Sequence, residues 1–223
     1  MDHSQHRQRI LARFERGEYL EDHELLEVLL FFSRPRVNTN GIAHELIDTC
    51  GSLREVLGAE KGALESVQGV GASSSTLLRL VGEILHRCKL SDCDVSKIYA
   101  DEDERKRYLC AVFDAASAEK VYMLMFGRTG RFIGCELVGE GILRESEINS
   151  IKAIQKARES GACSIIIAHN HPSGLSTPSG ADLETARRLD ILFSNADIDV
   201  IGHYVVSGYR CERYGYVSDS KKK

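Results

Sequence analysis

The sequence lacks a long hydrophobic run, a Cys-x-x-Cys pair and an excess of positive charge. Its longest apolar stretches, residues 25–32 and 165–168, are far shorter than the ~18–20 residues that a membrane helix needs. The first residues show no charged-then-apolar signal pattern. The formal net charge is −4, with 29 Lys and Arg against 33 Asp and Glu, which argues against a strongly basic nucleic-acid-binding protein. We therefore expect a cytoplasmic protein that has no membrane partner.

The seven cysteines are an odd number and have neither disulfide-framework nor zinc-cluster spacing. In a reducing compartment they are expected to be small core residues or inert thiols. A catalytic cysteine is not favoured, because no histidine stands in a recognisable partner pattern. The length of 223 residues allows one domain or two small ones.

The chain is predicted to divide near residues 90–100. Residues 1–90 are expected to be almost wholly helical, with a helix over 21–32 that Asp22 caps and a last helix over 74–87. Residues 91–103 contain five acidic residues and are predicted to form an exposed acidic connector. A mixed domain is expected over 104–218, followed by a disordered tail over 219–223.

The mixed domain alternates helical and strand patterns and contains no internal repeat. Strands are predicted over 121–126, 131–138, 163–168 and 200–207, the last of these being the final strand. Helices are predicted over 104–114, 148–160 and 181–195. Such alternation is typical of an α/β or α+β domain.

The most informative segment is the end of the strand predicted over 163–168. It is followed by His169 and His171, and residues two apart on a strand face the same side, so both imidazoles can reach one metal ion. A predicted helix then carries Asp182 in its first turn. Two imidazoles and one carboxylate, with a fourth position left to water, form a catalytic zinc shell. The alternatives are a chance His-x-His and a plain helix N-terminus with an acidic residue in the first turn.

This segment, His-Asn-His-Pro-Ser-Gly followed by Pro-Ser-x-x-Asp, resembles the signature of JAMM (MPN-plus) zinc metallohydrolases and, in its full form, that of RadC-like proteins. The resemblance covers about residues 98–218. It implies an α/β fold, a cytidine-deaminase-like α/β/α JAMM/MPN domain, preceded by a small all-α helix-hairpin-helix-like domain. It also implies one Zn²⁺ per chain, with His169, His171 and Asp182 as metal ligands.

The family pattern further implies a glutamate that moves protons as general base and then general acid. Glu119, before the strand over 121–126, stands at the matching position, and Glu136 and Glu140 are the competing candidates. Ser179 matches the motif serine, whose hydroxyl would stabilise an oxyanion, although it could also serve as the helix N-cap. Asn170 is expected to face away from the metal.

Two positions depart from the RadC-like pattern. An Asp-His pair is usual in the last strand, but this chain has Gly202 and His203 there. An Arg-Glu pair usually opens the helix before the metal strand, where this chain has Ile151 and Lys152. We expect His203 to be a plain buried histidine, because no neighbouring acid would orient it.

Residues 67–71, Val-Gln-Gly-Val-Gly, resemble the hairpin of helix-hairpin-helix modules, in which backbone amides receive a phosphate. The serines that follow replace the usual cations, and residues 1–90 hold 11 Lys and Arg against 13 Asp and Glu. The alternative is a tight turn inside a packed domain, so contact with DNA stays open and has little support.

The predicted function is zinc-dependent hydrolysis of amide bonds in a protein or peptide substrate. The alternative is a DNA-repair or DNA-associated accessory protein whose metal is structural or vestigial. The sequence does not indicate the particular substrate or the oligomeric state.

Overall fold

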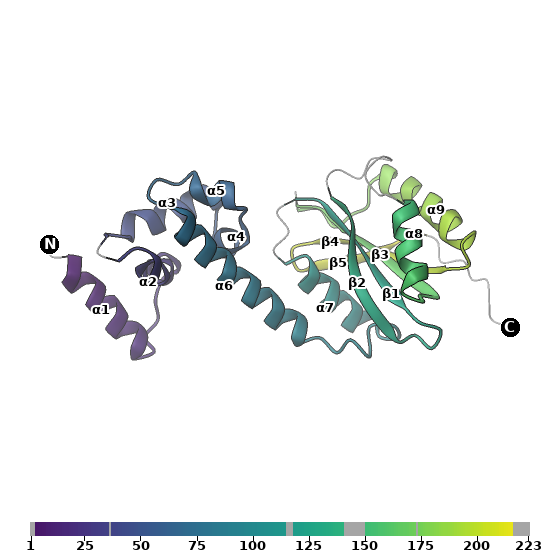
Figure 1. The fold of residues 1–223 in the computed structure, drawn as a ribbon, viewed down its shortest axis with the longest axis horizontal. Helices are drawn as coiled ribbons and strands as arrows, with labels where there is room; N and C mark the ends of the chain where they lie inside the picture. The colour runs from purple at the N-terminus through teal and green to yellow at the C-terminus, as the bar shows by residue number, and fades with distance from the viewer. Residues whose placement is uncertain (1–2, 36, 115–117, 141–149, 173, 216–223) are drawn as a thin grey trace. The chain divides into compact units, whose positions relative to one another are not determined.

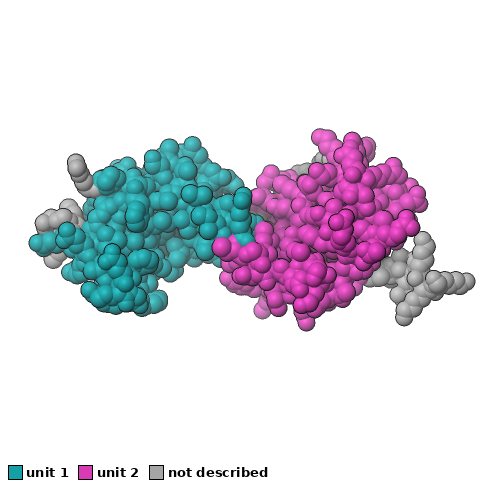
Figure 2. All heavy atoms as spheres, turned by 60° about the horizontal axis from the view of Figure 1, so that its bottom comes forward, with its two compact units in different colours: residues 1–87 teal, residues 88–223 magenta. Residues whose placement is uncertain are grey.

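The computed structural model describes residues 3–35, 37–114, 118–140, 150–172 and 174–215. The predicted disordered tail and the loop residues 141–149 lie outside these ranges. The chain forms two compact units, residues 1–87 and 88–223, which Figure 2 colours separately. Among the described residues, none of the helices has the length and apolar character that crossing a membrane requires.

The first unit is helical, as predicted, and is built around a small apolar core (Figure 1). Residues from five of its helices and the turn at 67–70 fill this core, including the fully buried Leu30, Leu46 and Leu78. The helices are α1 (His3–Glu15), α2 (Asp22–Ser33), α3 (Asn40–Cys50), α4 (Leu53–Gly58), α5 (Lys61–Glu65) and α6 (Ala72–Ser91), the last of which extends beyond residue 87.

The start of α2 differs from the prediction by one residue. Glu21, not Asp22, is the N-cap: its side chain accepts from the backbone N–H of Glu24, and the Glu24 carboxylate accepts from the backbone N–H of Glu21. This reciprocal pair is a capping box, with glutamate in place of the usual Ser or Thr at its first position.

The turn over residues 67–71 depends on a glycine for local packing. Gly69 has φ +93°, a region that L side chains rarely adopt, and a Cβ there would lie 2.8 Å from the Ile42 Cδ1 atom. Val67 and Val70 on either side are buried in the core. The glycine is therefore required for a tight turn inside a packed unit, and phosphate binding by this turn stays a prediction.

The second unit is a five-stranded mixed sheet with helices on both faces, which confirms the predicted α/β class (Figure 1). The strand order is β2-β1-β3-β4-β5, and only β3 and β4 pair in parallel. The elements are α7 (Glu102–Val112), β1 (Lys120–Phe126), β2 (Phe132–Glu140), α8 (Ser150–Glu159), β3 (Ser164–Asn170), α9 (Gly180–Ser194), β4 (Asp199–Ser207) and β5 (Arg210–Tyr214).

The prediction that the sheet ends at 200–207 is wrong. The chain turns back after Ser207, which pairs with Arg210, and β5 lies antiparallel to β4. Gly208, with φ +58°, takes the first position of the two-residue turn, as a type II′ hairpin requires. Only Cys211 of the short β5 is buried, so its hydrophobic pattern is weak.

Each face of the sheet has its own core. One face packs on α7, with Leu109, Phe126, Ile166 and Val206 among its buried residues. The other face packs on α8 and α9 through a set that includes Met123, Ala157, Ile165, Ile167, Leu189 and Phe193. The continuous apolar run of β3 is explained by burial on both faces, because all seven of its residues are buried.

The predicted exposed acidic connector is packed in part. Ile98 is fully buried in the α7 core, and its carbonyl accepts from Arg105 Nε at 2.8 Å. The helix α7 already begins at Glu102, where Asp101 caps it by accepting from two backbone N–H groups. Asp101, Glu102 and Asp103 thus stand at a helix N-terminus, where negative charge is favourable.

Candidate metal centre

The end of β3 carries the two histidines of the motif. His169 pairs with Val121 of β1 and with Val205 of β4, so it lies at the centre of the sheet. His171 follows the strand and still donates its backbone N–H to the Val206 carbonyl. Their imidazoles lie on the same side, as the strand spacing predicts, and Pro172 then ends the ladder.

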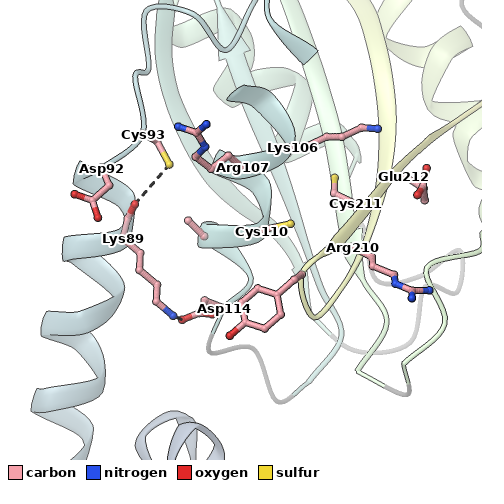
Figure 3. Close-up of a pocket in the computed structure, with 12 residues that line it drawn as sticks. Lys89, Asp92, Cys93, Lys106, Arg107, Cys110, Asp114, Arg210, Cys211 and Glu212 are labelled. Carbon is pink, nitrogen blue, oxygen red and sulfur yellow. Dashed lines mark hydrogen bonds and ion pairs between the residues drawn. The ribbon is translucent and has the colours of Figure 1, made fainter. Parts of the chain in front are cut away.

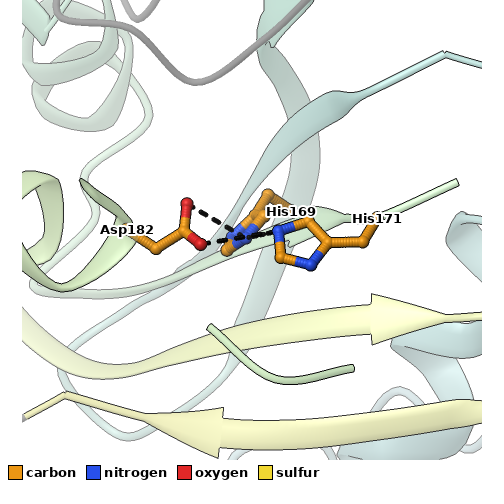
Figure 4. Close-up of side chains that lie close together, drawn as sticks. All are labelled: His169, His171 and Asp182. Atoms are coloured by element: carbon orange, nitrogen blue, oxygen red, sulfur yellow. Dashed lines mark hydrogen bonds and ion pairs between the residues drawn. The ribbon is translucent and has the colours of Figure 1, made fainter. Parts of the chain in front are cut away.

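Asp182 joins the two histidines from the first turn of α9, and the three side chains point toward one another (Figure 4). The Nε2 atoms of His169 and His171 are 3.1 Å apart. Asp182 Oδ1 lies 3.5 Å from His169 Nε2, and Asp182 Oδ2 lies 3.5 Å from His171 Nε2. The side chains of His169, His171 and Asp182 are 2%, 16% and 4% exposed, so His171 alone has appreciable contact with solvent.

Hydrogen bonds at the far nitrogens fix how the imidazoles are turned. The Nδ1 atom of His171 lies 2.8 Å from the carbonyl of Leu175, which can only accept, so Nδ1 carries a proton. In a neutral His171 the Nε2 atom therefore carries no proton, and its lone pair is directed at Asp182. The Nδ1 atom of His169 lies 3.2 Å from the hydroxyl of Tyr214.

The Asp182 carboxylate is held by a capping box at the start of α9. The Ser179 hydroxyl accepts from the backbone N–H of Asp182 at 3.2 Å and donates to Asp182 Oδ2 at 2.7 Å, and the Ser179 backbone N–H donates to the same oxygen. Burial alone would raise the pKa of Asp182, but the nearby His169 side chain and the hydrogen bonds from Ser179 outweigh it and hold this pKa below its usual range. Ser179 is thus the N-cap and also positions a candidate ligand.

Glu119 lies one residue before β1, and its side chain is half-buried. The β1–β3 ladder ends at the Val121–His169 pair, so Glu119 stands just before the end of β1 that lies beside the two histidines. The two competing glutamates are ion-paired with lysines: Glu136 with Lys156 at 3.0 Å and Glu140 with Lys120 at 3.7 Å. The group of possible ligands found among the described residues contains His169, His171 and Asp182 and does not include Glu119.

Asn170 faces away from the two imidazoles, as predicted, and is 4% exposed. Its Oδ1 atom accepts from the backbone N–H of Lys120 at 2.7 Å, and its Nδ2 atom donates to the Ala118 carbonyl at 3.0 Å. These two backbone groups flank Glu119. The motif asparagine therefore fixes the backbone from which Glu119 projects, a role that sequence reasoning did not identify.

The expectation that His203 has no acidic partner is wrong. Asp190 Oδ1, two turns along α9 from Asp182, lies 2.7 Å from His203 Nε2. The residue before His203 is Gly202, so the carboxylate comes from the neighbouring helix and not from the strand. At the other departure from the family pattern, Ile151 is 78% exposed and stands in the first turn of α8.

The donor set and its spacing fit a zinc ion. In a tetrahedral zinc site with bonds of about 2.0–2.1 Å, neighbouring ligand atoms are about 3.3–3.4 Å apart. The two histidine nitrogens are 3.1 Å apart, and each has a different Asp182 oxygen at 3.5 Å, so either oxygen could complete a set with them; one ligand atom from each of the three residues lies within 4.8 Å of the others. Two imidazoles and one carboxylate supply three ligands, which is the number that catalytic zinc sites use.

A cavity of about 640 Å³ lies on the α7 side of the sheet (Figure 3). Cys93, Cys110 and Cys211 line it together with charged residues of α7 and the β4–β5 hairpin. A hydrogen bond to Cys110, together with burial, raises the pKa of the Cys211 thiol. A protonated thiol is a poor nucleophile, so Cys211 is not an activated cysteine.

The fold and the site define a mixed-sheet domain with a His-x-His…Asp cluster at the end of a central strand. A family model described as "RadC-like JAB domain" matches residues 99–220. A UPF0758 protein of Aliivibrio salmonicida is 28% identical over 92% of this chain and 91% of its own length. A UPF0758 protein of Alteromonas mediterranea is 30% identical over 85% of this chain and 84% of its own length. The chain belongs to the RadC-like JAB domain family, and the predicted family is confirmed.

Proposed function

We propose that the protein is a zinc-dependent hydrolase of amide bonds, with His169, His171 and Asp182 as metal ligands. The convergence of lone pairs carries this proposal. His171 Nε2 offers a lone pair, because His171 Nδ1 donates to a carbonyl, and it lies 3.5 Å from Asp182 Oδ2 and 3.1 Å from His169 Nε2. An imidazole lone pair and a carboxylate oxygen that face each other at this distance repel, and a cation bound between them would turn that repulsion into attraction.

The residues around the site have separable roles in this proposal. A zinc ion held there would polarise an amide carbonyl and make water a stronger nucleophile at neutral pH. Glu119 takes a proton from the attacking water and delivers it to the nitrogen of the leaving amine. Asn170 holds the backbone on both sides of Glu119 and so fixes the point from which this side chain extends.

Ser179 is assigned an orienting role. Its hydroxyl hydrogen is directed to Asp182 Oδ2, at 2.7 Å, and that bond fixes the carboxylate. Stabilisation of an oxyanion by Ser179 would require the hydroxyl to rotate away from Asp182, and it stays a prediction of the family pattern.

The first experiment measures zinc by elemental analysis after dialysis of the purified chain. We expect about one zinc per chain in the wild-type protein. His169→Ala and Asp182→Ala should lose it, whereas His23→Ala, which changes a histidine of the first unit, should retain it. Zinc retention by both ligand variants would overturn the proposed site.

The second experiment separates catalysis from a structural metal. Glu119→Gln should keep the zinc and lose hydrolysis of a quenched fluorescent peptide library, whereas Glu136→Gln should keep both. X-ray absorption of the zinc-loaded wild-type protein should show three protein ligands and one solvent ligand. A closed shell of four protein ligands would favour the alternative, a DNA-associated accessory protein with a structural metal.

A further inference from the structure

Tyr214 ends β5 and reaches across the sheet to the candidate metal centre. It pairs with His203 of β4, and β4 separates its strand from β3. Its ring packs edge-on against the His169 imidazole, with centroids 5.6 Å apart and an interplanar angle of 87°. Its hydroxyl lies 3.2 Å from His169 Nδ1. The Tyr214 ring also lies beside the His203 ring, with centroids 5.7 Å apart.

The two candidate imidazole ligands are anchored in different ways. The carbonyl that accepts from His171 Nδ1 belongs to the backbone of Leu175, so no side-chain substitution removes it. The group at His169 Nδ1 is a side chain, the Tyr214 hydroxyl. His169 is therefore the ligand whose orientation depends on one replaceable residue.

The proton position on His169 has two competing solutions. If Nε2 carries the proton, it can donate to Asp182 Oδ1, 3.5 Å away, or to His171 Nε2, 3.1 Å away. In that form Nε2 has no lone pair left for a metal. A proton on Nδ1 is bonded by the tyrosine oxygen and leaves Nε2 free. The Tyr214 hydroxyl can donate to an unprotonated Nδ1 or accept from a protonated one, and the second arrangement is the one that leaves Nε2 able to bind a metal.

We propose that Tyr214 is a positioning residue that accepts the Nδ1 proton of His169 and so presents Nε2 to the metal. This inference rests on the proposed zinc site and adds a determinant of its affinity. Tyr214 does not touch the metal position itself. It acts through the ring of His169, by the hydroxyl bond and by the edge-on packing of the two rings.

The first test uses the wild-type, metal-free chain and needs no variant to fold. Long-range proton–nitrogen NMR at about pH 8 reports which nitrogen of His169 is protonated. We expect the Nδ1–H form. A predominant Nε2–H form would overturn the proposal, whether or not the chain binds zinc.

The second test compares Tyr214→Phe with Tyr209→Phe, which removes a hydroxyl from the 78% exposed tyrosine of the same hairpin. Zinc affinity is measured by competition with a chromophoric chelator. Tyr214→Phe should weaken zinc binding about 10- to 100-fold, and Tyr209→Phe should leave it unchanged. Equal affinity in Tyr214→Phe and wild type would overturn the proposal. A wild-type chain without zinc affinity would instead defeat the proposed function, and the NMR result would still decide the role of Tyr214.

Discussion

Asn170 Oδ1 accepts a 2.7 Å hydrogen bond from the backbone N–H of Lys120, at the level where the β1–β3 ladder ends. The Nδ2 atom of the same side chain donates to the carbonyl of Ala118. Beyond the end of the ladder, the buried side-chain amide of Asn170 therefore makes the hydrogen bonds to the two backbone groups on either side of Glu119. Because successive side chains of a strand point to opposite faces, His169 and His171 face the candidate metal position, and Asn170 between them faces the other way.

The substitution Asn170→Asp should separate positioning from metal binding. The aspartate retains an acceptor for Lys120 but loses the donor to Ala118 and buries a charge. The free energy of unfolding, from urea denaturation, should fall by about 1–3 kcal/mol. Hydrolysis should fall while zinc content stays at the wild-type level.

Asn38→Asp is the matched control for this change, because its exposed Oδ1 atom accepts from the Asn40 backbone N–H and an aspartate preserves that bond. Its stability and activity should stay close to wild type. Unchanged stability in Asn170→Asp would contradict the role assigned to the amide.

A second prediction concerns the contact between α7 and the sheet. The fully buried Tyr204 hydroxyl donates to Glu102 at 2.9 Å and accepts from Arg105 at 2.8 Å. Burial raises the pKa of Tyr204 to about 12, against the opposing effect of Arg105. Below about pH 10 the hydroxyl is protonated in both the folded and unfolded chains, so it adds no pH dependence there.

Between about pH 10 and 12 the unfolded tyrosine ionises while the folded one stays protonated, so stability falls as the pH rises. Tyr204→Phe removes this contribution. The difference in unfolding free energy between wild type and variant should shrink by about 1.4 kcal/mol per pH unit across this range, under reducing conditions. A difference that is constant with pH would contradict the raised pKa.

The sequence was sufficient for the parts of the fold and site that follow from local periodicity. The buried strand β3, the helix α9 and the positions of His169, His171 and Asp182 all follow from alternation, hydrophobic spacing and one cap. The His-x-His spacing is local, and so is the capping box that joins Ser179 to Asp182. Such features involve residues within four positions of each other.

The residues that the sequence did not identify are those brought together by pairing between strands and helices. Tyr214 lies 45 positions from His169, on a strand with a single buried residue, so its pattern gave no indication of a role. Asn170 and Ala118 are 52 positions apart. The Gly208 turn between Ser207 and Arg210 was the local feature that could have predicted β5, and with it Tyr214.

His203 illustrates the same limit. The family pattern places an acidic partner directly before His203, where this chain has Gly202. Instead, the Asp190 carboxylate of α9 lies 2.7 Å from His203 Nε2. The His203 Nδ1 atom is buried without a hydrogen-bond partner among the described residues. Loss of Asp190 would therefore leave both ring nitrogens of a buried histidine unpaired, and that arrangement is costly.

We expect Asp190→Ala to lower the free energy of unfolding by about 1–3 kcal/mol. Glu184→Ala, at an exposed position of the same helix, is the matched control and should stay within about 0.5 kcal/mol of wild type. In a His203→Phe background the cost of Asp190→Ala should largely disappear, because the unpaired imidazole is gone. An equal cost in both backgrounds would mean that the carboxylate stabilises the chain through some other contact.

The last prediction uses two serine caps with the same geometry. Ser179 accepts from the backbone N–H of Asp182 at 3.2 Å and donates to its carboxylate at 2.7 Å. Ser52, at the start of α4, accepts from the backbone N–H of Glu55 at 3.2 Å and donates to its carboxylate at 2.9 Å. Each serine replaced by alanine should cost about 0.5–2 kcal/mol of stability, the usual cost of losing an N-cap.

The two variants should differ in metal binding. Only Ser179 holds a candidate ligand, so Ser179→Ala should weaken zinc binding about 10-fold or more, while Ser52→Ala leaves it at the wild-type value. Thermal denaturation without metal checks the shared effect, and chelator competition checks the separate one. Equal zinc affinities in the two variants would mean that Asp182 is oriented by the helix backbone alone, and that the serine hydroxyl serves only the cap.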